Sequence, residues 1–217
     1  MLKTRGLLIS LEGIDGCGKT TQVELLGGKL AQSGVDYITV REPGGTVVGE
    51  KIRQILLDNQ YSPSLQAEML LYMAARSELA KQVILPALLS GKIIVCDRFT
   101  DSTLAYQGYG GGADLSLIRL LNLKATDGTA PHITVLLDLT VEEAVKRRGA
   151  SADRMESKDI RFHRRVRNGY LEIARQDPHR VSVVDASEVE EDQSEIIWQL
   201  VQGKIAGSFS ARSAYEF

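Results

Sequence analysis

Near its start the chain reads Gly13-Ile14-Asp15-Gly16-Cys17-Gly18-Lys19-Thr20-Thr21, and this run fits the pattern G-x-x-x-x-G-K-[ST] in full. The residues just before it, Leu7 to Leu11, are mostly branched and apolar, which is typical of a buried parallel strand. The apolar residues just after it recur at helical spacing: Val23, Leu25, Leu26 and Leu30. A strand, a glycine-rich turn and a helix in this order are the context in which the pattern binds phosphate.

The chemistry of this loop suits a nucleoside triphosphate. Its glycines let the backbone wrap closely around an anion with N–H groups pointing inward, and the following helix adds the partial positive charge of its N-terminus. Lys19 can reach the β- and γ-phosphates, and the Thr20 hydroxyl can ligate Mg²⁺. The alternative is a glycine-rich turn that binds nothing. The loop residues expected to contact the nucleotide are Gly13, Asp15, Gly16, Cys17, Gly18, Lys19, Thr20 and Thr21.

The composition is that of an ordinary globular protein, with 43% apolar and 25% charged residues among 217. A formal charge of −2 gives no reason to expect binding to nucleic acid or to a membrane. The opening apolar run is too short for a signal peptide or a membrane span. Cys17 and Cys96 do not suggest a disulfide framework. We therefore expect reduced thiols and a cytoplasmic protein.

Short apolar strands alternate with helical patterns along the chain, which predicts a parallel sheet with right-handed crossovers. The further strands are expected at 36–40, 92–97, 133–138 and 181–185. We predict an α/β fold: a doubly wound, five-stranded parallel sheet with helices on both faces. Ligands then bind at the carboxyl ends of the strands, where Arg41, Asp97 and Asp185 should meet the loop.

Two further stretches differ in their helical periodicity. A long helical stretch is expected from about 65 to 89, with a bend near Pro86. The last residues, from about 203 to 217, are rich in Ser and Ala and show no period, so we predict a tail there with no assignable role.

The residues after the strands narrow the class of nucleotide-binding protein. A GTPase switch carries an Asn-Lys-x-Asp loop, which this sequence lacks, and many motor ATPases end a strand in Asp-Glu. Here one strand ends in Asp97-Arg98 instead. Glu12 and Asp97 are candidate carboxylates for holding water on a Mg²⁺ bound by Thr20. Arg98 can clamp a second phosphate, and these features favour phosphoryl transfer between two nucleotides.

Three further stretches carry a resemblance: Arg41-Glu42-Pro43-Gly44-Gly45-Thr46, the helix containing Arg76, and the run Asp97-Arg98-Phe99-Thr100-Asp101-Ser102-Thr103-Leu104-Ala105-Tyr106-Gln107-Gly108. Together with the loop they resemble bacterial thymidylate kinases over most of the chain, and the last run is highly specific to that family. The resemblance implies transfer of the ATP γ-phosphoryl group to dTMP, giving dTDP, in a Mg²⁺-dependent cytoplasmic homodimer. It also implies one kinase domain over residues 1–203, with a lid at about 146–157 and a tail at 204–217.

For the base and sugar of dTMP, the resemblance points to one helix and to the loop. Tyr72 and Arg76 lie four residues apart and so share a helix face, where they resemble the family's thymine stacker and thymine reader. Most relatives have Phe at the stacking position. A core Tyr72 and a solvated Arg76 are the alternative. Asp15 resembles the carboxylate that accepts from the sugar 3′-hydroxyl, although an Asp in a turn can also bond its own backbone.

For the dTMP phosphate and base edge, the resemblance points to five further side chains. Arg53 and Arg98 resemble the two arginines that grip the phosphate. Thr103 and Gln107 match positions that face the base, where Gln107 offers a donor and an acceptor. Tyr106 matches the sugar side, with core packing as an alternative.

On the donor side, Lys146 to Arg154 is a basic run that matches the family's lid, although such a run can also be a solvated face. Some relatives carry an arginine in the loop where this chain has Gly16, so the lid should supply the catalytic guanidinium. Arg154 matches the family's lid arginine, with Arg148 and Arg147 as further candidates. Ala186 lies in a segment resembling the one near adenine. The residues expected to act on the transferred group are Lys19, Arg98, Arg148 and Arg154.

Two alternatives to dTMP phosphorylation remain at this level. One is a nucleotide-dependent switch or binding module with the same loop and no small acceptor. The other is a kinase for another pyrimidine monophosphate or for a deoxynucleoside.

Overall fold

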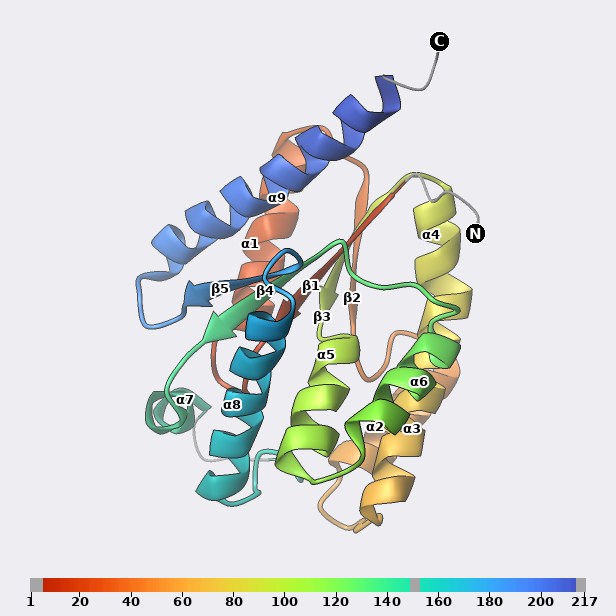
Figure 1. The fold of residues 1–217 in the computed structure, drawn as a ribbon, viewed down its shortest axis with the longest axis vertical. Helices are drawn as coiled ribbons and strands as arrows, with labels where there is room; N and C mark the ends of the chain where they lie inside the picture. The colour runs from red at the N-terminus through yellow and green to blue at the C-terminus, as the bar shows by residue number, and fades with distance from the viewer. Residues whose placement is uncertain (1–5, 149–152, 214–217) are drawn as a thin grey trace.

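A five-stranded, all-parallel sheet lies at the centre of the computed structural model (Figure 1). The structure describes residues 6–148 and 153–213, with residues 207–213 described by their backbone alone. The strands are β1 (Leu7–Glu12), β2 (Tyr37–Arg41), β3 (Ile93–Asp97), β4 (Ile133–Asp138) and β5 (Val181–Asp185). The predicted strands and the doubly wound α/β fold are thus confirmed, to within one residue at each strand end.

β1 is the central strand, in the order β2-β3-β1-β4-β5. It pairs with β3 on one side and β4 on the other, and all its residues are buried. An apolar run such as Leu7 to Leu11 suits this place because both faces of the strand are covered. After β1 the chain forms β2 and β3 on one side of it, and then β4 and β5 on the other side. A crevice forms at such a reversal, and in α/β sheets it binds ligands.

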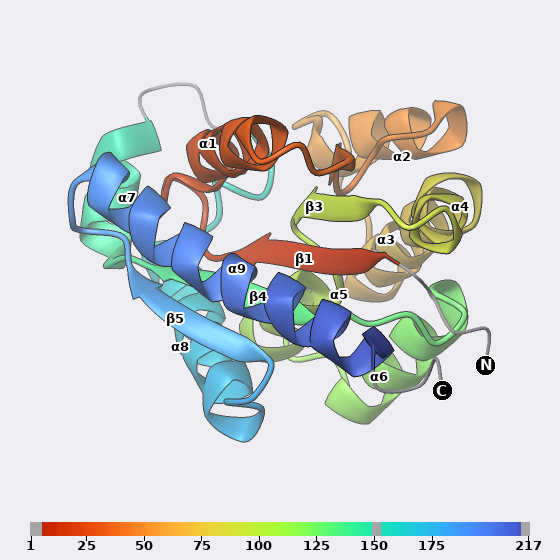
Figure 2. The same ribbon diagram turned by 90° about the horizontal axis from the view of Figure 1, so that it is seen from above.

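Helices cover both faces of the sheet; α1 and α8 lie on opposite sides of it in Figure 2. α9 contacts α1 as well as β4 and β5. The helices are α1 (Lys19–Gln32), α2 (Val47–Leu57), α3 (Leu65–Leu79), α4 (Leu85–Leu89), α5 (Thr100–Thr103), α6 (Leu115–Ala125), α7 (Val141–Arg148), α8 (Ile160–Gln176) and α9 (Glu190–Ser213), with π-helical segments η1 (Ala80–Ile84) and η2 (Leu104–Gly110).

The predicted helical stretch from 65 to 89 is confirmed, and it is interrupted by a π-helical segment. α3, η1 and α4 follow one another without a loop, and η1 ends just before Pro86. Proline lacks an N–H and crowds the carbonyl one turn earlier, and a wider turn at this point relieves that conflict.

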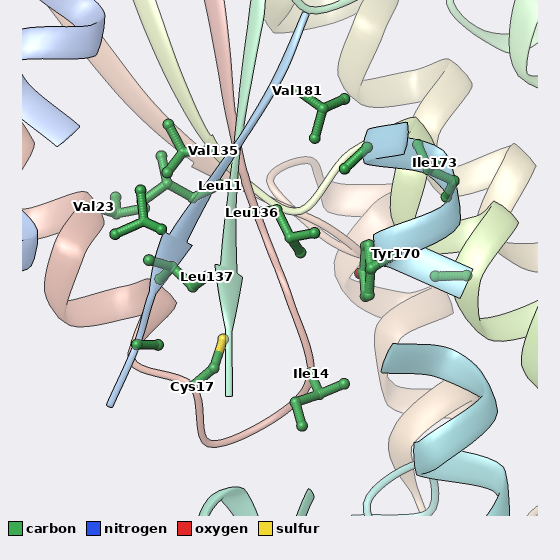
Figure 3. Packing of buried hydrophobic residues seen from close by; sticks show 14 of the residues in the cluster. Leu11, Ile14, Cys17, Val23, Val135, Leu136, Leu137, Tyr170, Ile173 and Val181 are labelled. Atoms are coloured by element: carbon green, nitrogen blue, oxygen red, sulfur yellow. The ribbon is translucent and has the colours of Figure 1, made fainter. Parts of the chain in front are cut away.

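The phosphate-binding loop is anchored in the main apolar core, as Figure 3 shows. Ile14 and Cys17 of the loop are 3% and 0% exposed, and they belong to one cluster with Leu137 of β4 and Tyr170 of α8. Full burial of a side chain the size of Ile contributes about 1.5–3 kcal/mol. The loop is therefore held in shape before any ligand binds.

The tail expected from residue 203 begins as a continuation of the last helix, because α9 extends to Ser213. Val201 is fully buried and Ile205 packs partly buried against the core cluster. Packing of these apolar residues outweighs the cost of Gly203 within the helix, about 1 kcal/mol. Ile197, Val201 and Ile205 lie four residues apart on one face of α9, a helical spacing that the composition rich in Ser and Ala obscures.

Candidate active site

A cleft of about 890 Å³ opens at the carboxyl ends of the strands. Its volume is in the range of small-molecule sites. Most of the residues predicted for the two nucleotides contribute to its wall: Asp15, Gly16, Gly18, Lys19, Thr20, Thr21, Arg53, Tyr72, Asp97, Arg98, Thr103, Tyr106, Gln107 and Arg147. The predicted residues outside this described wall are Glu12, Gly13, Cys17, Arg76, Arg148, Arg154 and Ala186.

The loop has the backbone geometry that an anion site needs. Gly16 and Gly18 have φ angles of +85° and +93°, a region that side-chain-bearing residues rarely adopt. At Gly16 an added Cβ would also lie 2.5 Å from the Ala144 carbonyl oxygen of α7. α1 begins at Lys19 after Gly18, which offers no side-chain acceptor to its first N–H groups. Those groups face the cleft and can donate to phosphate oxygens.

Lys19 lies in the loop with its Nζ donating to the Ile14 carbonyl oxygen at 2.9 Å. Cys17 Sγ is 3.7 Å from the same Nζ, and burial raises the pKa of the Cys17 thiol. The buried thiol therefore packs under the loop in its neutral form. Lys19 lines the cleft while being only 7% exposed, so its charge is weakly screened by solvent.

Thr20 and Asp97 form the arrangement of oxygens that suits Mg²⁺. The Thr20 hydroxyl donates to Asp97 Oδ2 at 2.9 Å, and both residues line the cleft. Mg²⁺ is usually held in kinases by one or two protein oxygens together with substrate phosphates and water. The described residues contain no cluster of three or more His, Cys, Asp or Glu side chains able to hold a metal. Thr20 and Asp97 offer two oxygens, which suits a metal that takes its other ligands from phosphate and water.

Glu12 is not among the described residues that line the cleft. It is fully buried, and its carboxylate accepts from the Phe99 backbone N–H at 2.7 Å, the Ser102 hydroxyl at 2.6 Å and the Tyr170 hydroxyl at 3.0 Å. Burial first, and then the charge of Asp101, raise the pKa of Glu12 to about 7. The described contacts of Glu12 are thus those of an internal hydrogen-bond network.

Arg98 is the centre of the acceptor side. It has a positive φ of 69°, and its Nη1 donates to the Gly13 carbonyl oxygen at 3.0 Å. Its Nη2 pairs with Asp15, whose other oxygen accepts from the Tyr106 hydroxyl at 2.7 Å. Burial alone would raise the pKa of Asp15, but the charges of Arg98 and Lys19 hold it well below its usual range. Asp15 is therefore ionised, and its ion pair fixes the orientation of the Arg98 guanidinium group.

Arg53 supplies a second cation on this side of the cleft. Its Nη1 donates to the Pro43 carbonyl oxygen at 2.8 Å, and both it and Arg41 line the cleft. Burial first, and then repulsion from Arg41, lower the pKa of Arg53. Two guanidinium groups that destabilise each other are well placed to accept an anion such as a phosphate.

Tyr72 and Arg76 do not share one environment, although both come from α3. Tyr72 lines the cleft, as predicted for a base-stacking ring. Burial first, and then the charge of Glu68, raise the pKa of the Tyr72 hydroxyl well above its usual value. Tyr72 therefore presents a neutral aromatic surface.

Arg76 is 1% exposed and lies behind the cleft wall. Its Nε donates to Glu42 at 2.8 Å, and its Nη1 donates to Thr103 at 2.8 Å and to Asn122 at 2.6 Å. Its Nη2 donates to Glu42 and, at 2.9 Å, to the Phe99 carbonyl oxygen. All five N–H groups of a guanidinium can be satisfied by these contacts. A direct contact with a base would therefore replace one of them, while Thr103 stands between Arg76 and the cleft.

The lid arginines diverge in the structure. Arg147 lines the cleft and donates to the Ala186 carbonyl oxygen at 3.0 Å, which places Ala186 next to the nucleotide region. The stem of Arg148 packs over the phosphate-binding loop, where its Cγ would lie 2.8 Å from a Cβ added to Gly16. Its Nη1 lies 3.4 Å from the Glu156 carbonyl oxygen. Residues 149–152 of the predicted lid lie outside the described residues.

Arg154 faces the acceptor side, contrary to its predicted position over the transferred phosphate. Its backbone N–H donates to the Leu57 carbonyl oxygen at 3.1 Å, and its Nε donates to that of Leu56 at 2.7 Å. Its Nη1 forms an ion pair with Glu68 at 2.6 Å, and its buried Nη2 has no partner in the described part of the chain. These contacts connect the second half of the lid to α2 and α3.

Three side chains that connect the cleft wall, the lid and the network around Glu12 were not predicted from the sequence: Glu68, Ser102 and Tyr170. Glu68 bonds both Arg154 and, at 2.9 Å, Gln107. Its spacing of four residues before Tyr72 was a signal, because it places both side chains on one helix face. Ser102 is part of the specific Asp97 to Gly108 run. Tyr170 carries no sequence signal beyond its place in an apolar stripe.

Comparison with known proteins gives one family. The sequence model described as thymidylate kinase matches residues 11–197. A thymidylate kinase of Caldanaerobacter subterraneus subsp. tengcongensis is 50% identical over 182 residues, covering 83% of this chain and 88% of that protein. One of Pelotomaculum thermopropionicum is 50% identical over 190 residues, covering 86% and 88%. A crystal structure of thymidylate kinase from Ehrlichia chaffeensis superposes with a TM-score of 0.77 at 36% identity, covering 90% of this chain and 98% of that one.

In the described ranges, 6–148 and 153–213, no helix has the length and apolar character required to cross a membrane.

Proposed function

Since the chain belongs to the thymidylate kinase family, we propose that it transfers the γ-phosphoryl group of ATP to dTMP, giving dTDP and ADP. The observation that carries this proposal is that one cleft contains both the phosphate-binding loop and the Arg98–Asp15 pair. The loop suits a triphosphate donor, and the fixed guanidinium suits the phosphate of a second nucleotide.

On the donor side, Lys19 and the N-terminal N–H groups of α1 hold the β- and γ-phosphates, with Gly13, Gly16, Gly18, Cys17 and Thr21 shaping the loop around them. Arg147 and Ala186 lie toward the nucleoside end. We assign to Arg148 the guanidinium that offsets charge on the transferred group, because its stem packs over the loop.

Mg²⁺ fits at Thr20 and Asp97, whose oxygens lie together at the cleft wall. When bound there, it neutralises phosphate charge.

On the acceptor side, Arg98 and Arg53 grip the dTMP phosphate, and Asp15 accepts from the sugar 3′-hydroxyl. Tyr72 stacks on thymine, Thr103 and Gln107 face its edge, and Tyr106 lines the sugar. Arg76 acts on thymine from behind Thr103, to which it donates.

The reaction needs these groups to bring two anions together. An oxygen of the dTMP phosphate forms a bond to the γ-phosphorus, as the bond from that phosphorus to the bridging oxygen of ADP breaks. Lys19, Arg98 and Arg148 surround this point with positive charge, and catalysis in such sites is mainly positioning and charge stabilisation.

We also propose that the protein is a cytoplasmic homodimer. Four exposed leucines lie on the adjacent helices α3 and α6: Leu70 (52% exposed), Leu117 (44%), Leu120 (52%) and Leu123 (55%). An exposed apolar patch of this kind is typical of a protein interface. Sedimentation equilibrium should give twice the chain mass, and Leu120→Glu should give a monomer. A wild-type monomer at micromolar concentration would contradict the dimer.

The deciding experiment measures ADP release with ATP, Mg²⁺ and a panel of nucleoside monophosphates. We expect dTMP to be strongly preferred over dCMP. Preference over dUMP should be weaker, because a single methyl group is worth roughly 1–3 kcal/mol. ADP release that does not depend on any acceptor would favour a nucleotide-dependent switch. A preference for dCMP, dUMP or a deoxynucleoside would favour the other kinase alternatives.

A further inference from the structure

The lid arginine Arg154 is connected to the acceptor site through one carboxylate. Its Nη1 is 2.6 Å from Glu68 Oε2, and the side chains are 12% and 4% exposed. The two backbone carbonyls at the end of α2 that accept from Arg154 fix it from the other side. A charge pair shielded in this way holds a definite geometry, since few water molecules can compete for its groups.

The second oxygen of Glu68 acts on Gln107. Gln107 Nε2 donates to Glu68 Oε1 at 2.9 Å, and Gln107 is 1% exposed while lining the cleft. A carboxylate paired with a guanidinium only accepts hydrogen bonds. The Gln107 amide must therefore turn its nitrogen toward Glu68, which leaves its oxygen as the group available to a ligand.

The direction of this amide matters for the choice of base. Thymine carries a hydrogen at N3 and can donate it to an amide oxygen. Cytosine has an unprotonated N3, which is an acceptor and would face the same oxygen. A buried polar group left opposite the wrong partner gives strong discrimination, since sites built to hydrogen-bond a substrate reject mismatched analogues by large factors.

We propose that Glu68 and Arg154 are positioning residues for base selection: they hold the Gln107 amide with its oxygen toward the cleft, which selects an acceptor base that carries a hydrogen at N3. This inference rests on the proposed function, and it gives the second half of the lid a role at the acceptor base. Arg154 then acts through Glu68 and Gln107 and does not need to approach the transferred phosphate.

The test compares kcat/KM for dTMP, dCMP and 3-methyl-dTMP in the full chain and in Glu68→Gln. A neutral amide at position 68 can accept or donate, so the Gln107 amide is no longer fixed. We expect the dTMP-to-dCMP ratio to fall at least tenfold, mainly through a higher KM for dTMP with kcat within about twofold. Discrimination against 3-methyl-dTMP should fall in parallel. Glu78→Gln, the same change on α3 at a carboxylate that bonds only nearby Gln82 among the described contacts, should leave all three values unchanged.

A double-mutant cycle shows whether Glu68 acts through Gln107. In a Gln107→Leu background, Glu68→Gln should no longer change the dTMP-to-dCMP ratio. Arg154→Met should lower the ratio in the same way, and Arg154→Lys should restore part of it. If Glu68→Gln does not fold, the Arg154 variants carry the same test.

Three outcomes separate the possibilities. A wild-type protein that does not prefer dTMP overturns the proposed function itself. A wild-type preference for dTMP that survives unchanged in Glu68→Gln and Arg154→Met overturns only the positioning role. A loss of kcat in Arg154→Met with an unchanged ratio also overturns it and returns Arg154 to the transferred phosphate.

Discussion

The donor and acceptor halves of the cleft are built in different ways. The donor half is one continuous loop, residues 13–21, whose shape is fixed by glycine conformations and by Ile14 and Cys17 in the core. The acceptor half collects single side chains from α2, α3, the end of β3 and η2. Its charged members are held by buried pairs such as Arg76–Glu42 and Arg154–Glu68. In the donor half, the residues that supply catalytic charge are therefore largely different from those that stabilise the fold. In the acceptor half, the same charged side chains do both.

Removing the donor cation gives the largest expected effect. Lys19→Ala should lower kcat at least a thousandfold, about 4 kcal/mol of barrier, because the positive charge opposite the phosphates is lost. The midpoint of urea denaturation should change little, since the alanine leaves the helix start intact. Lys81→Ala, at an exposed lysine of η1, is the control. Near-normal turnover in Lys19→Ala would show that the donor site is elsewhere.

On the acceptor side, Arg76→Ala should reduce stability as well as activity. Truncation leaves the Glu42 carboxylate buried without its partner, which typically costs about 3–5 kcal/mol of unfolding free energy. Urea denaturation measures this loss, with Arg175→Ala as a control at an exposed ion pair. Where the variant is folded, dTMP efficiency should fall far more than dCMP efficiency. Equal losses of efficiency for dTMP and dCMP would show that Arg76 does not select the base. An unchanged free energy of unfolding would show that Arg76 does not link activity to stability.

The lid contains one arginine on each side: Arg148 packs on the donor loop, and Arg154 pairs with Glu68 on the acceptor side. Single-turnover transfer should slow about a hundredfold in Arg148→Ala, roughly 2.7 kcal/mol, with dTMP affinity nearly unchanged. Arg154→Ala should instead weaken dTMP binding. Arg175→Ala, at an exposed ion pair within α8, serves as the control for both. If Arg148→Ala and Arg147→Ala transfer phosphate at the wild-type rate, neither of these arginines acts on the transferred group.

A pH-dependent effect on stability is expected from Glu12, which is outside both halves of the cleft wall. Its pKa of about 7 in the folded state lies above the usual 4.5, so the folded protein binds the extra proton between these values. Stability should therefore fall as pH rises from about 4.5 through 7, by roughly 3 kcal/mol, and be level above about 8.

Glu12→Gln is neutral at every pH, so it should remove this slope and be more stable than wild type at pH 8. Urea denaturation at pH 5, 6, 7 and 8 measures it, with exposed Glu191→Gln as the control. A slope that persists in Glu12→Gln would assign the titration to another group.

The sequence alone determined the strands, the phosphate-binding loop and the family, because these depend on short contiguous patterns. Apolar runs such as 133–138 mark buried strands, and the loop glycines and Lys19 act within a few residues of one another. The pairing of Thr20 with Asp97 was also within reach, since both follow parallel strands whose carboxyl ends meet. The helix through Ser213 was not predicted, because the composition rich in Ser and Ala after Gly203 obscures the four-residue spacing of Ile197, Val201 and Ile205.

The tertiary structure decided where each charge points. Arg76, Arg148 and Arg154 are alike in sequence as basic helix or lid residues, yet one is buried on Glu42, one packs over the loop and one pairs with Glu68. Glu12 and Asp97 both end strands, but only Asp97 reaches the cleft wall. A long charged side chain is directed by the partners that compensate its burial, and those partners come from distant parts of the chain. Local patterns therefore place the backbone, while long-range packing assigns the direction of each charged group.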